Sequence, residues 1–82
     1  MTITTIDSGI YPTFRCAEFV CGKTRAYVQR HDDGRWRVLK FTSHDQRLGT
    51  GRGFASHAEA VAGYKQPEMK AILEAAPAML GV

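Results

Sequence analysis

The sequence predicts an α+β fold, a meander of three or four antiparallel strands packed by one helix, with a second, short helix near the C-terminus. Alternating apolar residues between positions 25 and 41 predict a β-hairpin, because successive side chains of a strand point to opposite faces. A helix-capping pattern at Ser56 follows this hairpin. The 82 residues are expected to form one small domain, residues 1–82, with a thin core.

The N-terminal part of the chain is expected to add two strands. Residues 2–6 are rich in β-branched side chains and predict a short strand, which Ser8-Gly9 and Pro12 should end. Residues 13–21 predict a second strand. Its apolar candidates for the core are Phe14, Cys16 and Val20.

The hairpin is predicted from residues 25–31 and 35–41, with its turn at residues 32–34. A period of two places four apolar residues on the core side: Ala26, Val28, Trp36 and Val38. The opposite face then carries Arg25, Tyr27, Gln29, Arg35, Arg37 and Leu39. Two interpretations of this face remain open, a solvated surface that keeps the sheet soluble and a surface that binds phosphates.

Two helices are expected after the hairpin. Ser56 and Glu59 have the spacing of a capping box, and Pro67 should end the helix that they start. Residues 67–76 predict the second helix, which Pro77 should stop. Its apolar stripe, which either completes the core or forms a dimer or partner interface, consists of Met69, Ile72, Leu73 and Ala76.

Positive charge is concentrated in the hairpin segment. The whole chain has a net charge of +3, but residues 23–52 contain eight Lys or Arg against three Asp, a local charge of +5. The remaining residues sum to −2. Such an asymmetry is typical of a surface that meets a polyanion, which could be nucleic acid or an acidic protein surface.

The sequence contains no recognisable motif for catalysis, metal binding or cofactor binding. Cys16 and Cys21 are five residues apart, so on one strand they point to opposite faces and cannot form a disulfide. The paired spacing of a zinc site is missing, and the glycines at positions 49–53 lack the Walker spacing and lysine. No nucleophile, base and orienting group can be named together, so the protein is expected to be non-catalytic, without metal or cofactor.

The N-terminal residues have no basic start and no long apolar run, so no secretory signal is expected. No segment of about 18 apolar residues predicts a membrane span. Together with two unlinked cysteines, these features favour a soluble protein in the reducing cytoplasm.

Three segments resemble the ethylene-response-factor (apetala-type) DNA-binding domain and, in plan, the arm-binding domains of tyrosine integrases. They are GRWRVLK at residues 34–40, RLGT at 47–50 and GFASHAEAVAGY at 53–64. The resemblance implies a three-stranded sheet that lies in the DNA major groove and a helix that braces its back. It places Arg35 and Arg37 beside the matching strand and Arg47 where the family has a contacting tryptophan. Leu39 and Phe41 depart from the family's contacting acid and arginine.

The sequence therefore favours a non-catalytic nucleic-acid-binding module, with DNA favoured over RNA. Its candidate contact residues are Arg25, Tyr27, Arg35, Arg37, Arg47 and Arg52. The alternative is a small interaction or inhibitor protein of the phage or plasmid type that binds a larger protein. Such a protein could bind its partner through the basic surface or through a stripe formed by Met69, Ile72 and Leu73. Homodimerisation is also left open.

Overall fold

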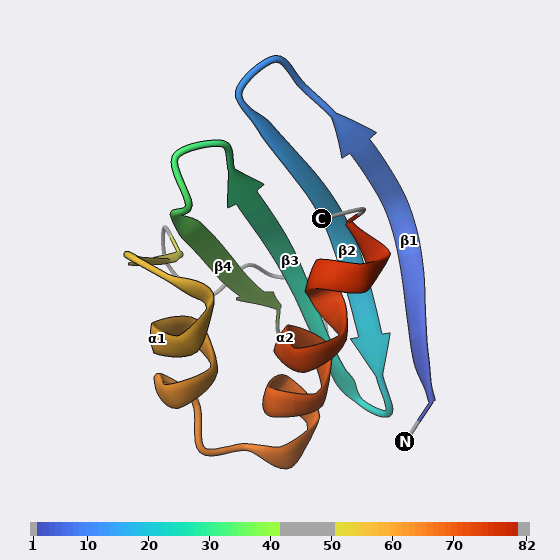
Figure 1. Cartoon of the computed structure of the whole chain (residues 1–82). Helices are drawn as coiled ribbons and strands as arrows, with labels where there is room; N and C mark the ends of the chain where they lie inside the picture. Colours follow the sequence, from blue (N-terminus) through green and yellow to red (C-terminus); the bar gives the residue numbers. More distant parts are fainter. Residues whose placement is uncertain (1, 42–50, 81–82) are drawn as a thin grey trace.

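Five antiparallel strands form one sheet, and two helices cover one of its faces (Figure 1). The computed structural model describes residues 2–41 and 51–80. The strands lie across the sheet in chain order, so each pairs with its neighbour in the sequence. The elements are β1 (Ile3–Ile10), β2 (Phe14–Cys21), β3 (Thr24–His31), β4 (Trp36–Phe41), β5 (Arg52–Phe54), α1 (His57–Ala62) and α2 (Pro67–Met79).

The predicted α+β meander is confirmed, although it has five strands in place of three or four. β1 does not end at Ile6. Its pairing with β2 continues to Ile10 through a register irregularity between Ile6 and Gly9, the kind of local bulge that lets a strand pass a glycine. β5 pairs with β4 and was not predicted. The sequence also indicates a short strand at residues 46–50, which lie outside the described residues.

The β3–β4 hairpin has the predicted turn and register. The Gly34 amide donates to the His31 carbonyl at 3.0 Å, and the His31 amide donates to the Arg35 carbonyl at 2.8 Å. Gly34 has a φ of 91°, a conformation that glycine adopts without strain. All four residues predicted for the core side are buried: Ala26, Val28, Trp36 and Val38.

The apolar candidates of β2 do not join the core cluster under the helices, although one of them, Cys16, is buried on the opposite face. β2 pairs with β3 so that Ala17 lies opposite Val28 and Phe19 opposite Ala26, which puts the other set of β2 side chains in the core. Apolar residues occupy both faces of this strand, so the period of two could not decide between them. The side chains that join the core are Ala17, Phe19 and Cys21. Cys16 lies on the opposite face, and both cysteines are buried and free of a disulfide, as expected.

The C-terminal helix is the larger of the two and covers most of the sheet. α2 has 13 residues and contacts β1, β2 and β3, whereas the six-residue α1 contacts β4 and β5. Met69, Ile72 and Leu73 are each 0% exposed, within the same core cluster as Phe19. The stripe therefore completes the core. The prediction that these three residues bind a partner was wrong, because they leave no surface for one.

The predicted helix start is confirmed. The Ser56 hydroxyl accepts a hydrogen bond from the Glu59 amide at 3.2 Å, and the Glu59 carboxylate accepts one from the Ala55 amide at 3.0 Å. α1 ends at Ala62, ahead of Pro67, with Gly63 as its C-cap. A Cβ at Gly63 would lie 2.6 Å from the Phe54 ring, so the glycine lets the helix end approach β5 closely.

Pro77 lies inside α2 and does not stop it. A proline has no amide hydrogen, so the carbonyl of the residue four positions earlier, Leu73, loses its helical donor. The His57 ring supplies a replacement, with Nε2 2.6 Å from the Leu73 oxygen. The same ring lies 4.9 Å from the Trp36 ring, centroid to centroid. His57 therefore joins β4, α1 and α2, a role that its sequence position did not indicate.

Replacement of Trp36 by alanine is expected to lower the free energy of unfolding by about 3–5 kcal/mol, because a large buried ring leaves a cavity. Trp36 is 4% exposed. Urea denaturation measures the loss. Ile10→Ala is the control, since Ile10 is 79% exposed and its truncation should change stability by less than about 0.5 kcal/mol. Equal effects of the two variants would contradict this packing.

His57→Phe is expected to lower the free energy of unfolding by about 1–3 kcal/mol, because it keeps a ring beside Trp36 but leaves the Leu73 carbonyl without its donor. In a Pro77→Ala background the restored amide at position 77 can bond to that carbonyl, so the same replacement should cost less. A double-mutant cycle measured by chemical denaturation gives the difference. Additive losses would show that His57 and Pro77 act independently.

Candidate nucleic-acid interface

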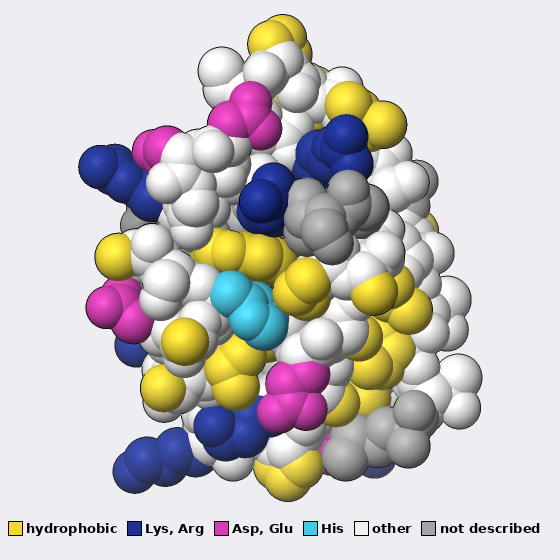
Figure 2. Space-filling model, in the orientation of Figure 1, with side chains coloured by type: hydrophobic (Ala, Val, Ile, Leu, Met, Phe, Trp, Pro, Cys, Tyr) yellow, Lys and Arg dark blue, Asp and Glu magenta, His cyan; other side chains and the backbone are white. Residues whose placement is uncertain are grey.

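The face of the sheet opposite the helices, here called the outer face, carries most of the residues predicted to bind nucleic acid. On the helix-bearing side, Lys and Arg side chains stand in several separate groups among hydrophobic and polar ones (Figure 2). No single basic patch is visible from that side. A shared cationic surface must therefore be sought on the outer face.

The middle of the outer face is not open to solvent. Leu39, predicted to lie on this face, is 5% exposed, and Cys16 is 2% exposed. The chain passes close to Leu39 at Gly51, where a Cβ would come within 2.7 Å of the Leu39 side chain. The outer face is therefore not solvated throughout, because Leu39 and Cys16 are buried on it.

Tyr27 lies in this covered region and is only partly exposed. Burial, with a hydrogen bond to Cys16 as a second cause, raises the pKa of its phenol from 10.0 to about 12. Leu39 and Glu18 are its direct neighbours across the sheet. The ring therefore serves the packing of this face, and its edge is poorly placed for a ligand.

Arg25 lies on the outer face but is engaged within the protein. Its guanidinium is 2.8 Å from a carboxylate oxygen of Glu18, in a pair whose side chains are 33% and 12% exposed. A partly buried pair of this kind is costly to break, because one charge would then be buried alone. Arg25 is consequently a poorer phosphate contact than a fully exposed arginine.

Arg52 points to the other side of the sheet. It lies opposite Val38, a core-side residue, and its guanidinium is 5.1 Å from the ring centroids of both Phe54 and Tyr64. It also donates to the Gly63 carbonyl at 2.8 Å. Burial raises the pKa of Tyr64, and the nearby positive charge of Arg52 partly offsets this rise. Arg52 thus braces the end of α1 and does not share a face with Arg35 and Arg37.

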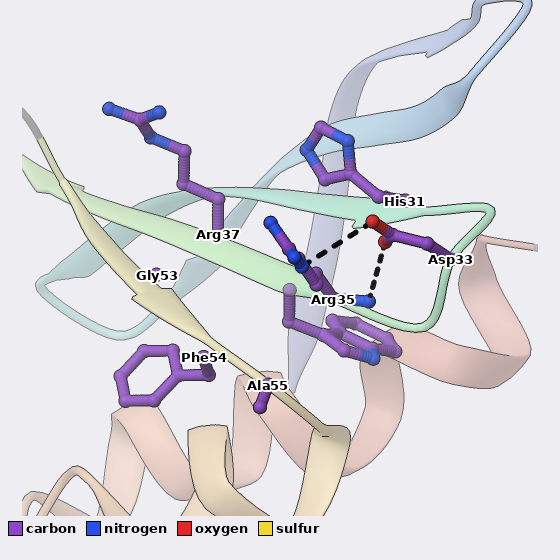
Figure 3. Close-up of a pocket in the computed structure, with 8 residues that line it drawn as sticks. His31, Asp33, Arg35, Arg37, Gly53, Phe54 and Ala55 are labelled. Atoms are coloured by element: carbon purple, nitrogen blue, oxygen red, sulfur yellow. Dashed lines mark hydrogen bonds and ion pairs between the residues drawn. The ribbon is translucent and has the colours of Figure 1, made fainter.

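Arg35 and Arg37 come together at the turn end of the outer face. They rise with His31 from one side of β3 and β4, whereas Phe54 and Ala55 lie on the opposite side (Figure 3). Arg37 is exposed and lies directly opposite Gly53, where a side chain would meet only open space. The hollow beside them, here called the arginine hollow, has a volume of about 530 Å³. The residues that line it are His31, Asp33, Arg35, Trp36, Arg37, Gly53, Phe54 and Ala55, so the hollow reaches from the outer face to the edge of the sheet at β5.

Asp33 is the acidic member of the arginine hollow. Its carboxylate accepts a hydrogen bond from the Arg35 amide at 3.0 Å and lies 3.4 Å from the Arg35 Nε. The two side chains are 76% and 59% exposed, Arg35 first. Exposed pairs of this type contribute only about 0–1 kcal/mol, so a phosphate could replace the carboxylate at little cost. Among the described residues that line the hollow, two carry guanidinium groups and one carries a carboxylate.

Of the six residues predicted to bind nucleic acid, the structure brings Arg35 and Arg37 together in the open. Arg25 and Tyr27 share their face but are held by neighbours, and Arg47 lies outside the described residues. Sequence reasoning missed His31 and Gly53. The alternation that placed Gln29 on the outer face also places His31 there, whereas Gly53 could not be found without the pairing of β5.

The described residues contain no group of three or more His, Cys, Asp or Glu that could hold a metal ion. In the same part of the chain, neither helix is long and apolar enough to cross a membrane. The described residues of the outer face offer guanidinium groups, an imidazole and aromatic rings.

No protein-family model, curated protein or solved structure matches this chain. The resemblance to the ethylene-response-factor domain stays a prediction. The site must be judged on its own geometry.

Raising the pH from 10 to 12 is expected to destabilise the protein partly through Tyr27. Its pKa is raised to about 12 in the folded chain, so over this range the unfolded chain loses the phenol proton while the folded chain keeps it. Tyr27→Phe should therefore lose less stability between these pH values, as measured by urea denaturation. Tyr11→Phe, which changes an exposed ring, is the control. The same decline in wild type and Tyr27→Phe would mean that Tyr27 is not buried as described.

Proposed function

We propose that the protein is a small, non-catalytic nucleic-acid-binding module that contacts phosphates through the outer face of its sheet. The observation that carries the proposal is the pairing of Arg35 and Arg37 beside the arginine hollow. Both are exposed, both project from the same side of β4, and the facing Gly53 leaves the approach open.

Guanidinium groups suit this role because each offers planar, paired donors that match phosphate oxygens, and their charge is permanent. Arg35 directly precedes β4 and Arg37 is the second residue of β4, and both side chains rise from the same side of the sheet (Figure 3). The charge of +5 in residues 23–52 would attract a polyanion to the protein. DNA is the favoured ligand over RNA, in agreement with the family resemblance, and the proposed location is the cytoplasm.

A second candidate function, binding to another protein, is supported by a different feature. Several large apolar side chains are exposed along β1 and at the end of α2: Ile6, Ile10, Tyr11 and Met79. β1 is also an edge strand, whose outer backbone groups could pair with a strand of a partner. In this case the arginines would steer an acidic partner and mainly affect the rate of association.

Replacing Arg35 and Arg37 together with glutamine is expected to weaken binding to nucleic acid and to flatten its salt dependence. Each neutralised phosphate contributes about 0.9 to the slope of log affinity against log salt on duplex DNA, so the slope should fall by roughly two units. Fluorescence anisotropy with labelled duplex and single-stranded DNA at several salt concentrations measures it.

The matched control is Lys23→Gln with Lys65→Gln, which removes the same charge from two exposed lysines. Lys23 lies in the turn between β2 and β3, at the other end of the sheet, and Lys65 follows α1. The control should keep most of the slope. If wild type binds neither duplex nor single-stranded nucleic acid at low salt, the proposal fails. If the two double variants lose the same affinity and salt dependence, binding reflects net charge alone and not a site at Arg35 and Arg37.

A further inference from the structure

Three rings form a ladder across the turn end of the outer face. The Tyr11 and Phe14 rings are stacked at 4.7 Å between centroids with 16° between their planes, and the Phe14 and His31 rings at 5.1 Å with 29°. Phe14 and His31 are paired residues of β2 and β3, and Tyr11 lies in the turn before β2. The ladder therefore runs in one row from the turn before β2 across β2 and β3.

The ladder ends at the arginine hollow. His31, its last ring, lines the hollow, and its Nε2 is 3.1 Å from the Gln29 amide oxygen, which accepts a hydrogen bond from the ring. The His31 amide is bonded to the Arg35 carbonyl, so Arg35 continues the same row. Aromatic stacking surface and guanidinium charge thus follow one another across the sheet.

Core packing does not account for this ladder. It lies on the face away from the helices, and Tyr11 is 52% exposed. A Cβ at Gly9 would come within 2.8 Å of the Tyr11 ring, so the glycine leaves room for the ring to lie close to β1. The Tyr11 ring is held by its stacking on Phe14 and still exposes part of its aromatic surface to solvent.

We propose that this row binds single-stranded nucleic acid, with an unpaired base stacked on Tyr11 and phosphates held by Arg35 and Arg37. The inference rests on the proposed function and specifies its ligand. Unpaired bases expose their ring faces to aromatic side chains, whereas the bases of a duplex stack on one another and are closed to them. The hollow of about 530 Å³ is within the range of pockets that take small ligands, which suits a nucleotide unit beside the arginines.

The test compares a labelled oligothymidylate with a DNA duplex of the same total charge, by fluorescence anisotropy. Wild type should bind the oligothymidylate more tightly. Tyr11→Ala should weaken that binding about 5- to 150-fold, the equivalent of about 1–3 kcal/mol per stacked base, without changing the salt slope. Arg35→Gln with Arg37→Gln should instead reduce the slope by about 1.4, at about 0.7 per phosphate on a single strand.

Tyr11→Phe keeps the ring and should bind like wild type, whereas Tyr11→Leu keeps an apolar side chain against Phe14 and should bind like Tyr11→Ala. Thermal melts establish that each variant is folded. If the protein binds the duplex as tightly as the oligothymidylate, or if Tyr11→Leu binds like wild type, the inference is wrong while the proposed function stands. If neither nucleic acid binds at low salt, both fail, and a protein ligand becomes the better explanation.

Discussion

The contact of His57 with Trp36 and Leu73 is the junction on which the arrangement of the two helices depends. Pro77 removes the amide that would have bonded to the Leu73 carbonyl, and the His57 ring takes its place at 2.6 Å. Because His57 is the first residue of α1 and also lies against Trp36 of β4, one side chain fixes α1, α2 and the sheet together. A buried carbonyl without a donor would cost about 1–3 kcal/mol, a large part of the stability of so small a domain.

Because both helices lie on one face of the sheet, that face forms the core and the opposite face is left to meet solvent or a ligand. The core side is filled by residues of β2 to β4, among them Phe19 and Trp36, and by the stripe of α2, so the stripe itself is not available to a partner. The outer face is then divided. Its middle, around Leu39 and Tyr27, is partly covered, and its turn end holds Arg35, Arg37 and the ring ladder. Among the described residues, the two exposed arginines of this face lie at this end.

Much of the fold could be predicted because local patterns agreed with the tertiary structure. The alternation around Trp36 and the cap at Ser56 each had one physical solution. β2 did not, because apolar residues on both faces left its register to its pairing with β3. Pro77 misled for a related reason, since the side chain that replaces its missing hydrogen bond lies 20 positions away along the chain. Tertiary contacts of this sort carry no local sequence signal.

For the candidate site, the sequence shows how many arginines there are but does not show which of them are engaged within the protein. Sequence counting treats the arginines of the hairpin segment alike, but their surroundings differ. Arg25 pairs with Glu18 at 2.8 Å and Arg52 lies over two rings on the helix-bearing side, so both stabilise the fold. Arg35 pairs with an exposed carboxylate, that of Asp33, and exchange of this partner for a phosphate costs little. A cation contributes to binding only to the extent that it gains more from the ligand than it gives up in the free protein. By that criterion the turn end of the outer face, where Arg35 adjoins the ring of His31, is the part of the described surface best suited to an anionic, aromatic ligand.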